Sequence, residues 1–120
     1  MWVLAALPSG SDVVRVLARG RPVAAIRRAD AVWKGGLMDG SGVVSAATSE
    51  KFRDLEVTWA SRAEERHGGR TSPEELLAAS HASCFAMALS NGLGKGGTPP
   101  ERLEVSASVT FDRVGEGFGV

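Results

Sequence analysis

The sequence predicts an α+β domain in which an antiparallel sheet packs on one long central helix. Two observations predict this class. Short segments with apolar residues at alternate positions lie on both sides of one long helical segment, and such alternation is typical of strands with one buried face. A capping motif and glycine-rich residues frame that segment at 72–92, which indicates a helix of about five turns. The 120 residues are enough for one domain with a modest core.

Residues 1–26 do not share the pattern of the remaining chain. They are rich in alanine, valine and arginine and are interrupted by PSGSD and RGRP. The start lacks the basic region and the cleavage motif of a signal peptide. We interpret residues 1–26 as an extension of unknown role. A short added helix or strand at residues 12–19 is the alternative.

Two strand regions are expected before the helix. ADAVWK, from residue 29, places apolar residues at alternate positions, GGLMDGSG forms a turn, and VVSAAT returns as the second strand of a hairpin. LEVTWA, at 55–60, reads as a further strand with Leu55, Val57 and Trp59 facing inward. The polar segment EERHGGR then forms a loop.

The long helix has a well-marked start. Ser72 is a suitable N-cap, Pro73 fits the first helical position, and Glu75 completes a capping box. Asn91 and Gly92 are expected to end the helix. Small residues lie nearly all the way round it, and a helix with so little polar surface is typically buried. We therefore expect it to be covered on several sides.

The most regular alternation in the chain is LEVSASVTFD, at 103–112, which predicts a strand with one apolar and one polar face. RVGEG reads as a turn and FGV as the start of a further strand. Because the chain stops in what reads as mid-strand without a partner, we expect it to be an incomplete domain, part of a longer one.

Composition excludes several classes of function. The net charge of +0 and the absence of a basic run argue against nucleic acid and anionic membranes as partners. No apolar stretch is expected to be long enough to cross a bilayer. One cysteine excludes an intrachain disulfide and a cysteine-based zinc site, and His67 and His81 are too few for a metal cluster. A lone thiol suits a reducing cytoplasm, so we expect a cytoplasmic protein without metal or cofactor.

Cys84, the one cysteine, lies in the middle of the predicted helix. Free cysteine is often only a small core residue, and its thiol ionises near pH ~8.5 unless a positive group stabilises the thiolate. The helix N-terminus is too distant to do so. His81, three residues earlier, could lie beside Cys84, although it could equally be a surface or core histidine. Arg62 is the better candidate because it stays charged.

TSPEELLAASHASCFAMALS resembles the signature helix of the OsmC/Ohr family of thiol-dependent organic hydroperoxide reductases. The resemblance extends through VWKGGLMDGSGVVS, VTWASRAE and GTPPERLEVSASVTFD, so that it covers about residues 27–120. It implies that residues 27–120 are the N-terminal part of an OsmC-like domain. It also implies an intertwined homodimer with active sites at the subunit interface.

The resemblance implies roles for three residues. Cys84 occupies the place of the peroxidatic cysteine, Glu74 that of a carboxylate orienting an arginine, and Arg62 that of the arginine. In the family, the thiolate attacks the distal oxygen of an organic hydroperoxide, and the sulfenic acid condenses with a resolving cysteine. That cysteine lies in a later helix, before which this chain ends. An external dithiol, in one branch a lipoylated protein, regenerates the enzyme.

Glu74 and Cys84 are ten positions apart, which on a straight helix is ~15 Å along the axis. If Glu74 acts at the site of the Cys84 thiol, it must therefore come from a second subunit. Otherwise Glu74 is an ordinary acidic residue at a helix start. Three functions remain open: a hydroperoxide reductase, a non-catalytic dimerisation domain in which Cys84 packs, and a thiol-based redox sensor or binding protein.

Overall fold

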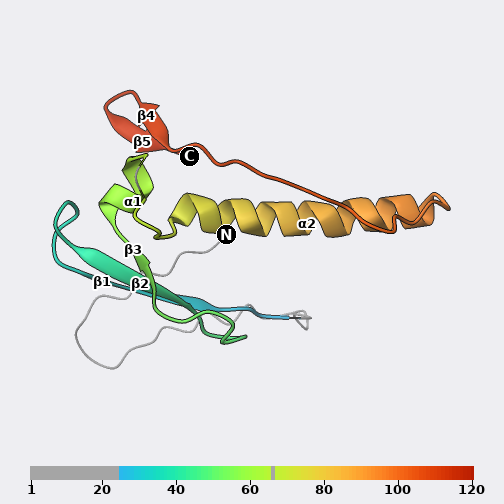
Figure 1. Cartoon of the computed structure of the whole chain (residues 1–120), viewed down its shortest axis with the longest axis horizontal. Helices are drawn as coiled ribbons and strands as arrows, with labels where there is room; N and C mark the ends of the chain where they lie inside the picture. The colour runs from blue at the N-terminus through green and yellow to red at the C-terminus, as the bar shows by residue number, and fades with distance from the viewer. Residues whose placement is uncertain (1–24, 66) are drawn as a thin grey trace, which may run out of the picture.

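A computed structural model describes residues 25–65 and 67–120 of the chain. The elements are β1 (Ala29–Lys34), β2 (Ser41–Ala46), β3 (Leu55–Val57), α1 (Trp59–Ala63), α2 (Pro73–Lys95), β4 (Asp112–Val114) and β5 (Gly117–Gly119). Two antiparallel sheets accompany one long helix (Figure 1), which confirms the α+β class. The predicted extension at residues 1–26, including its alternative at 12–19, lies outside the described residues except for its last two positions.

The first sheet has the strand order β1-β2-β3, and every pair is antiparallel. The β1–β2 register runs from the Ala29–Ala46 pair to the Lys34–Ser41 pair, which confirms the predicted hairpin. Its turn is closed by a hydrogen bond from Gly40 N to Gly36 O of 2.8 Å. The indole Nε1 of Trp33 donates to the carbonyl oxygens of Gly35 and Gly36, at 3.2 and 3.3 Å. The tip of the hairpin is therefore held from inside the turn.

The strand predicted at 55–60 is shorter than expected, because a helix begins within it. β3 ends at Val57, and Trp59 is the first residue of α1. Thr58 Oγ1 accepts from Ser61 N at 3.0 Å, while Ser61 Oγ accepts from Thr58 N at 3.0 Å. This capping box satisfies backbone groups that a continuing strand would need to pair. Local capping overrides the alternation, and the expectation that Trp59 lies in a strand is wrong.

The start of α2 agrees with the sequence in two of three features. Ser72 is the N-cap, with its Oγ accepting from Glu75 N at 3.1 Å, and Pro73 opens the helix. The reciprocal half of the predicted capping box does not form. Instead, the Glu75 carboxylate accepts a hydrogen bond from Thr71 Oγ1 at 2.8 Å.

The end of α2 lies beyond the predicted stop at Asn91 and Gly92. The helix continues to Lys95, and Gly97 then adopts a positive φ of 83°. Gly97 N donates to Gly94 O at 3.1 Å, and Thr98 N donates to Leu93 O at 2.9 Å. This pair of bonds is a Schellman motif, which needs a left-handed residue only at Gly97.

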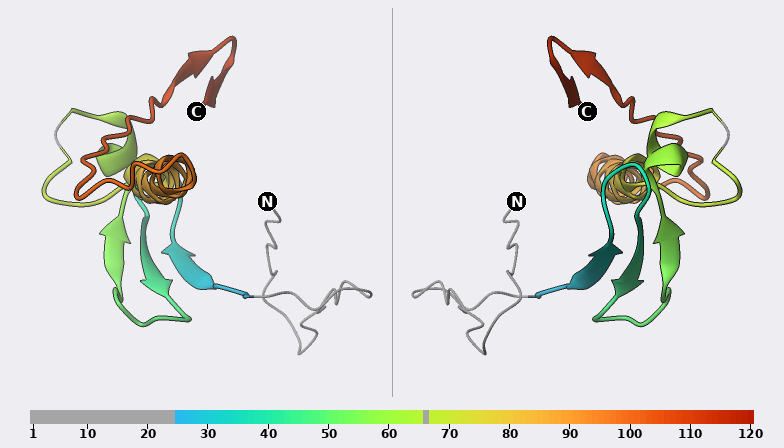
Figure 2. Two further views of the ribbon diagram at one scale, coloured as in Figure 1. Left: turned by 90° about the vertical axis from the view of Figure 1, so that its right-hand side faces the viewer. Right: turned by 90° about the vertical axis from the view of Figure 1, so that its left-hand side faces the viewer.

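α2 is covered along one stripe instead of on several sides. Glu74 is its one buried residue, and Cys84 is exposed. Half-buried residues follow Glu74 at four-residue intervals, namely Ala78, Ala82 and Ala86, which is the spacing of one helix face. Ala78 lines one open pocket together with residues 107–109, where the chain returns along α2 (Figures 1 and 2). The prediction of a helix covered on several sides is therefore wrong for the single chain.

The returning segment, residues 103–111, covers all but the last residue of the strand predicted at 103–112. Its side chains alternate as predicted, because Leu103, Val105, Ala107, Val109 and Phe111 are half-buried and the residues between them are exposed. The segment nevertheless pairs with no strand in the described part of the chain. The sequence therefore predicted its two faces correctly but not its lack of a hydrogen-bonded neighbour.

The last segment forms a hairpin of its own. β4 pairs with β5 in antiparallel register, from the Asp112–Gly119 pair to the Val114–Gly117 pair. The predicted turn is confirmed, with Gly115 at a φ of 61°. The expected final strand without a partner therefore has one, in β4.

Among the described residues, no apolar side chain is fully buried. Twelve large apolar side chains are exposed, including Leu77, Phe85, Met87 and Leu89 on α2. Exposed apolar side chains in this number are expected where a further surface covers them. The single chain thus positions its elements without enclosing a core.

In the part of the chain described by the structure, α2 is long and apolar enough, by length and composition, to cross a membrane. The expectation that no stretch reaches this length is therefore wrong for α2. The central helices of soluble proteins satisfy the same criterion, and the first turn of α2 carries Glu74 and Glu75. The absence of a membrane partner stays a prediction.

Candidate functional site

The centre of the candidate site is an ion pair between α1 and α2. Arg62 Nε donates to Glu74 Oε1 at 2.9 Å. The Glu74 side chain is 7% exposed and the Arg62 side chain 32% exposed. The capping box fixes the start of α1, which carries Arg62, and the Ser72 N-cap fixes the start of α2, which carries Glu74. The structure thus brings together two of the three residues predicted from the sequence.

The second carboxylate oxygen of Glu74 is unusual. Glu74 Oε2 is buried and has no hydrogen-bond partner among the described residues. A buried acceptor left without a donor is costly. The carboxylate therefore retains the capacity to accept one more hydrogen bond from a group outside the described residues.

Arg62 also lies against an aromatic ring. Its Cζ is 4.2 Å from the ring centroid of Phe111, which is cation–π geometry. Only Nε of the guanidinium bonds to a described residue, so both terminal Nη groups are free of such bonds. Together, the carboxylate and the ring hold the guanidinium while the N–H donors of its two Nη groups stay available to a ligand.

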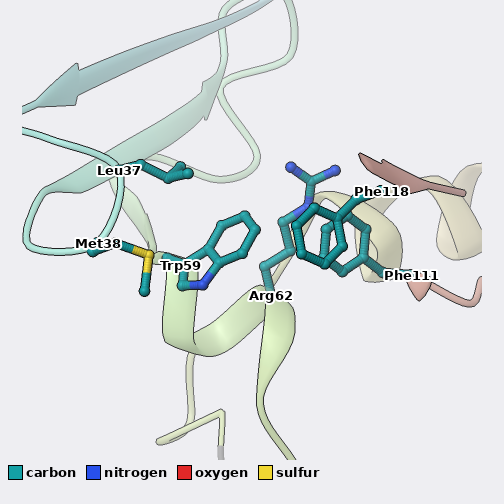
Figure 3. Close-up of a pocket in the computed structure, with 6 residues that line it drawn as sticks. All are labelled: Leu37, Met38, Trp59, Arg62, Phe111 and Phe118. Atoms are coloured by element: carbon teal, nitrogen blue, oxygen red, sulfur yellow. The ribbon is translucent and has the colours of Figure 1, made fainter. Parts of the chain in front are cut away.

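Three aromatic residues form a cluster around this arginine (Figure 3). The rings of Phe111 and Phe118 stack with centroids 5.1 Å apart. The Trp59 ring meets both edge-on, with centroids 5.8 Å from Phe111 and 5.5 Å from Phe118. This cluster joins α1, the end of the returning segment and β5.

An open pocket adjoins Arg62 and the aromatic cluster. Its lining residues are Leu37, Met38, Trp59, Arg62, Phe111 and Phe118 (Figure 3). Leu37 and Met38 come from the tip of the β1–β2 hairpin. The pocket thus combines apolar walls with a single cation, a combination suited to an apolar molecule with one polar group.

Cys84 lies apart from this site within one chain. α2 is a continuous helix, so the ten residues from Glu74 to Cys84 span ~15 Å along its axis. The Cys84 side chain is exposed. The third predicted residue is therefore available to a partner but does not reach the Arg62–Glu74 pair of its own chain.

Neither histidine ring has a described interaction with Cys84, Arg62 or Glu74. His81 is exposed, and its ring lies 6.5 Å from the ring of Phe85, centroid to centroid. His67 accepts a hydrogen bond from Gly69 N through Nδ1 at 3.1 Å. In residues 25–65 and 67–120, no group of three or more metal-ligating side chains gathers.

Sequence reasoning missed the aromatic cluster. Trp59 and Phe111 were assigned to the inward faces of two strands, and Phe118 received no role. The alternating pattern indicated that Phe111 would be covered, but no local signal connects it with Arg62. Contacts between residues so distant in the chain depend on how the elements pack.

Comparison with known proteins gives concordant matches. A family model described as OsmC-like protein matches residues 66–119. The chain is 37% identical over 94 residues to Peroxiredoxin OsmC of Escherichia coli (strain K12) and, to the same extent, to Peroxiredoxin OsmC of Shigella flexneri. The aligned part is 78% of this chain and 64% of each relative. The chain therefore spans slightly less than two thirds of the length of these relatives.

Proposed function

The chain belongs to the OsmC-like proteins, and from this premise we propose that it reduces organic hydroperoxides to alcohols with Cys84 as the attacking thiol. The observation that carries the proposal is the Arg62–Glu74 ion pair, with its 2.9 Å contact and with two Nη groups that bond to none of the described residues. The relatives bear the name peroxiredoxin. The apolar pocket beside Arg62 favours an organic group over hydrated hydrogen peroxide.

The proposed first step is a two-electron transfer. The Cys84 thiolate attacks the distal oxygen of R–O–O–H, the O–O bond breaks, and an S–O bond forms. Sulfur is oxidised to the sulfenic acid, while the peroxide is reduced to an alkoxide that takes up a proton and leaves as the alcohol. The Arg62 guanidinium would stabilise both the thiolate and the developing alkoxide charge.

The proposed second step returns Cys84 to its reduced form. A dithiol attacks the sulfenic acid, releases water and forms a mixed disulfide, which its second thiol then resolves. Because the sequence holds one cysteine, the dithiol is supplied from outside this chain. We propose a reducing, cytoplasmic environment and a dithiol donor such as a lipoylated protein.

The proposal requires a second copy of the chain. Because Cys84 does not reach Arg62 within one chain, we propose a homodimer in which Cys84 of one copy faces Arg62 of the other. The small and exposed residues of α2 support this arrangement, since small side chains allow two helices to approach closely. Glu74 would then act together with Arg62 across the interface.

The direct test is turnover of cumene hydroperoxide with dihydrolipoamide as the reductant. We expect turnover in the wild type and its loss in Cys84→Ser, with Glu75→Gln as a control that retains turnover. Stable sulfenic acid without turnover would favour a redox sensor. An unreactive Cys84 would favour the non-catalytic domain.

A complementation experiment tests the shared site. Cys84→Ser and Arg62→Ala are each expected to be inactive. When refolded together in equal amounts, half of the dimers are mixed, and one of their two sites holds both residues. We expect recovery of about a quarter of wild-type turnover. Absence of recovery from a mixture shown to contain mixed dimers would contradict a site shared between subunits.

A further inference from the structure

We propose that Phe111 is a positioning residue for Arg62, and that the β4–β5 hairpin holds Phe111 in place through Phe118. The inference rests on the proposed function for its catalytic consequence. Its structural part, a guanidinium fixed by an aromatic ring, is tested separately below.

Two contacts of different kinds constrain Arg62. The Glu74 carboxylate accepts from Nε at 2.9 Å and fixes one edge of the guanidinium. The Phe111 ring lies 4.2 Å from Cζ and faces the guanidinium. An arginine side chain otherwise samples many rotamers, which weakens any interaction that depends on orientation. With the edge and the plane both constrained, the two Nη groups are presented in one direction.

Phe111 is itself held by its neighbours. Its ring stacks on Phe118 with an angle of 15° between the planes, and the Trp59 ring meets it edge-on at 87°. Trp59 opens α1, the helix that also carries Arg62. Each of the three rings of Trp59, Phe111 and Phe118 therefore contacts the other two, and Trp59 links them to α1 (Figure 3).

Phe118 connects this aromatic cluster to the sheet formed by β4 and β5. It is the central residue of β5 and pairs with Arg113 of β4. The hairpin holds Phe111 in two ways: β4 begins at the next residue of the backbone, and the Phe118 ring of β5 stacks on the Phe111 ring. The hairpin thereby contributes to the candidate site although it provides no charged group that contacts Arg62.

The test compares Phe111→Leu, which removes the ring face but keeps an apolar side chain, with Phe111→Trp, which keeps a ring. Phe52→Leu is the matched control, because Phe52 is half-buried before β3 and takes no part in the aromatic cluster. For each homodimer we would record the NMR signal of the Arg62 Nε proton, its exchange with water, and kcat and KM for cumene hydroperoxide.

We expect Phe111→Leu to speed exchange of the Arg62 Nε proton and to lower kcat about 3- to 10-fold. Phe111→Trp should preserve both quantities, and Phe52→Leu should match the wild type. An unchanged Nε signal and exchange rate in Phe111→Leu would overturn the proposal. If Phe111→Leu does not fold, the Phe111→Trp variant decides. In that variant, exchange of the Arg62 Nε proton as fast as that of the exposed Arg53 would also overturn the proposal.

The two proposals fail in different ways. A wild-type protein without turnover contradicts the proposed function, while the exchange measurement still tests the hold of Phe111 on Arg62. A wild-type protein with turnover and an Nε proton indifferent to residue 111 contradicts only the positioning role.

Discussion

The Glu74 carboxylate illustrates what a single residue contributes here. It is buried, it pairs with Arg62 through one oxygen, and its other oxygen has no partner among the described residues. A buried charge is tolerated when it is paired. The free oxygen indicates that the pair is not optimised for stability alone, as expected where a further group has to bind.

Glu74→Ala should destabilise the protein more than Glu75→Ala. Both carboxylates lie in the first turn of α2 and interact similarly with the helix dipole. Glu74→Ala also removes the Arg62 contact, which, discounted for the partial exposure of Arg62, should cost about 1–2 kcal/mol of unfolding free energy. Urea denaturation of the two variants measures the difference. Equal losses would show that the ion pair adds nothing to stability.

Arg62→Lys should retain the fold but lose activity. Lysine keeps the positive charge, yet it lacks the Nε edge that meets Glu74 and the planar face that meets Phe111. We expect kcat/KM for cumene hydroperoxide to fall at least about tenfold. Steady-state kinetics measures the change, and Arg53→Lys, at an exposed ion pair with Glu50, is the control. A fully active Arg62→Lys variant would mean that charge alone suffices.

The sequence predicted Arg62, Glu74 and Cys84 through a family resemblance, and the structure brings the first two together. It could not predict that Phe111 lies on Arg62, because that contact joins residues far apart in the chain. The geometric argument that Cys84 cannot reach Glu74 along a straight helix depends only on helix rise, and the continuous α2 supports it.

At the level of elements, capping chemistry decided where α1 and α2 begin. Thr58 and Ser61 diverted a predicted strand into a helix. At the other end of α2, the sequence offers several glycines, and the rule for helix ends selected the first. Glycine is tolerated inside a helix at a modest cost, so only the position that requires a positive φ, Gly97, marks the true end.

Gly92→Ala and Gly97→Ala should therefore have opposite effects. Gly92 is helical, and a Cβ there meets no atom within 4 Å, so alanine should stabilise the protein by about 0.5–1 kcal/mol. Gly97 has a φ of 83°, where alanine should cost about 1 kcal/mol or more. Chemical denaturation gives both values. Destabilisation by Gly92→Ala would reveal that another chain lies close to this backbone.

At the level of the whole molecule, the described residues position a site without fully burying any apolar side chain. Apolar burial is the main favourable contribution to folding. The proposed homodimer would provide it by covering the exposed apolar residues of α2, such as Phe85 and Met87. Folding and association of this chain would then be one process.

The thermal midpoint should consequently rise with protein concentration. We expect a measurable increase over a roughly hundredfold concentration range, because association stabilises only the folded chains. Circular dichroism gives the midpoint, and sedimentation gives the mass at each concentration. A constant midpoint together with a monomeric mass would contradict the homodimer.

The fold class and most elements could be predicted from the sequence, because alternation and capping are local. Strand partners could not. The alternation in residues 103–111 specifies which side chains are half-buried but carries no information about which strand forms hydrogen bonds with that backbone.

The backbone of residues 103–111, which pairs with no strand among the described residues, also affects how newly made chains fold. This segment lacks proline and alternates apolar with polar residues. Because its amide and carbonyl groups pair with no strand in the described part of the chain, it can act as a template for another extended peptide. In newly made chains, docking with the proper neighbour would therefore compete with binding to chaperones, cleavage by proteases and aggregation. The speed of that first encounter, more than the final stability, would then set the yield of native protein.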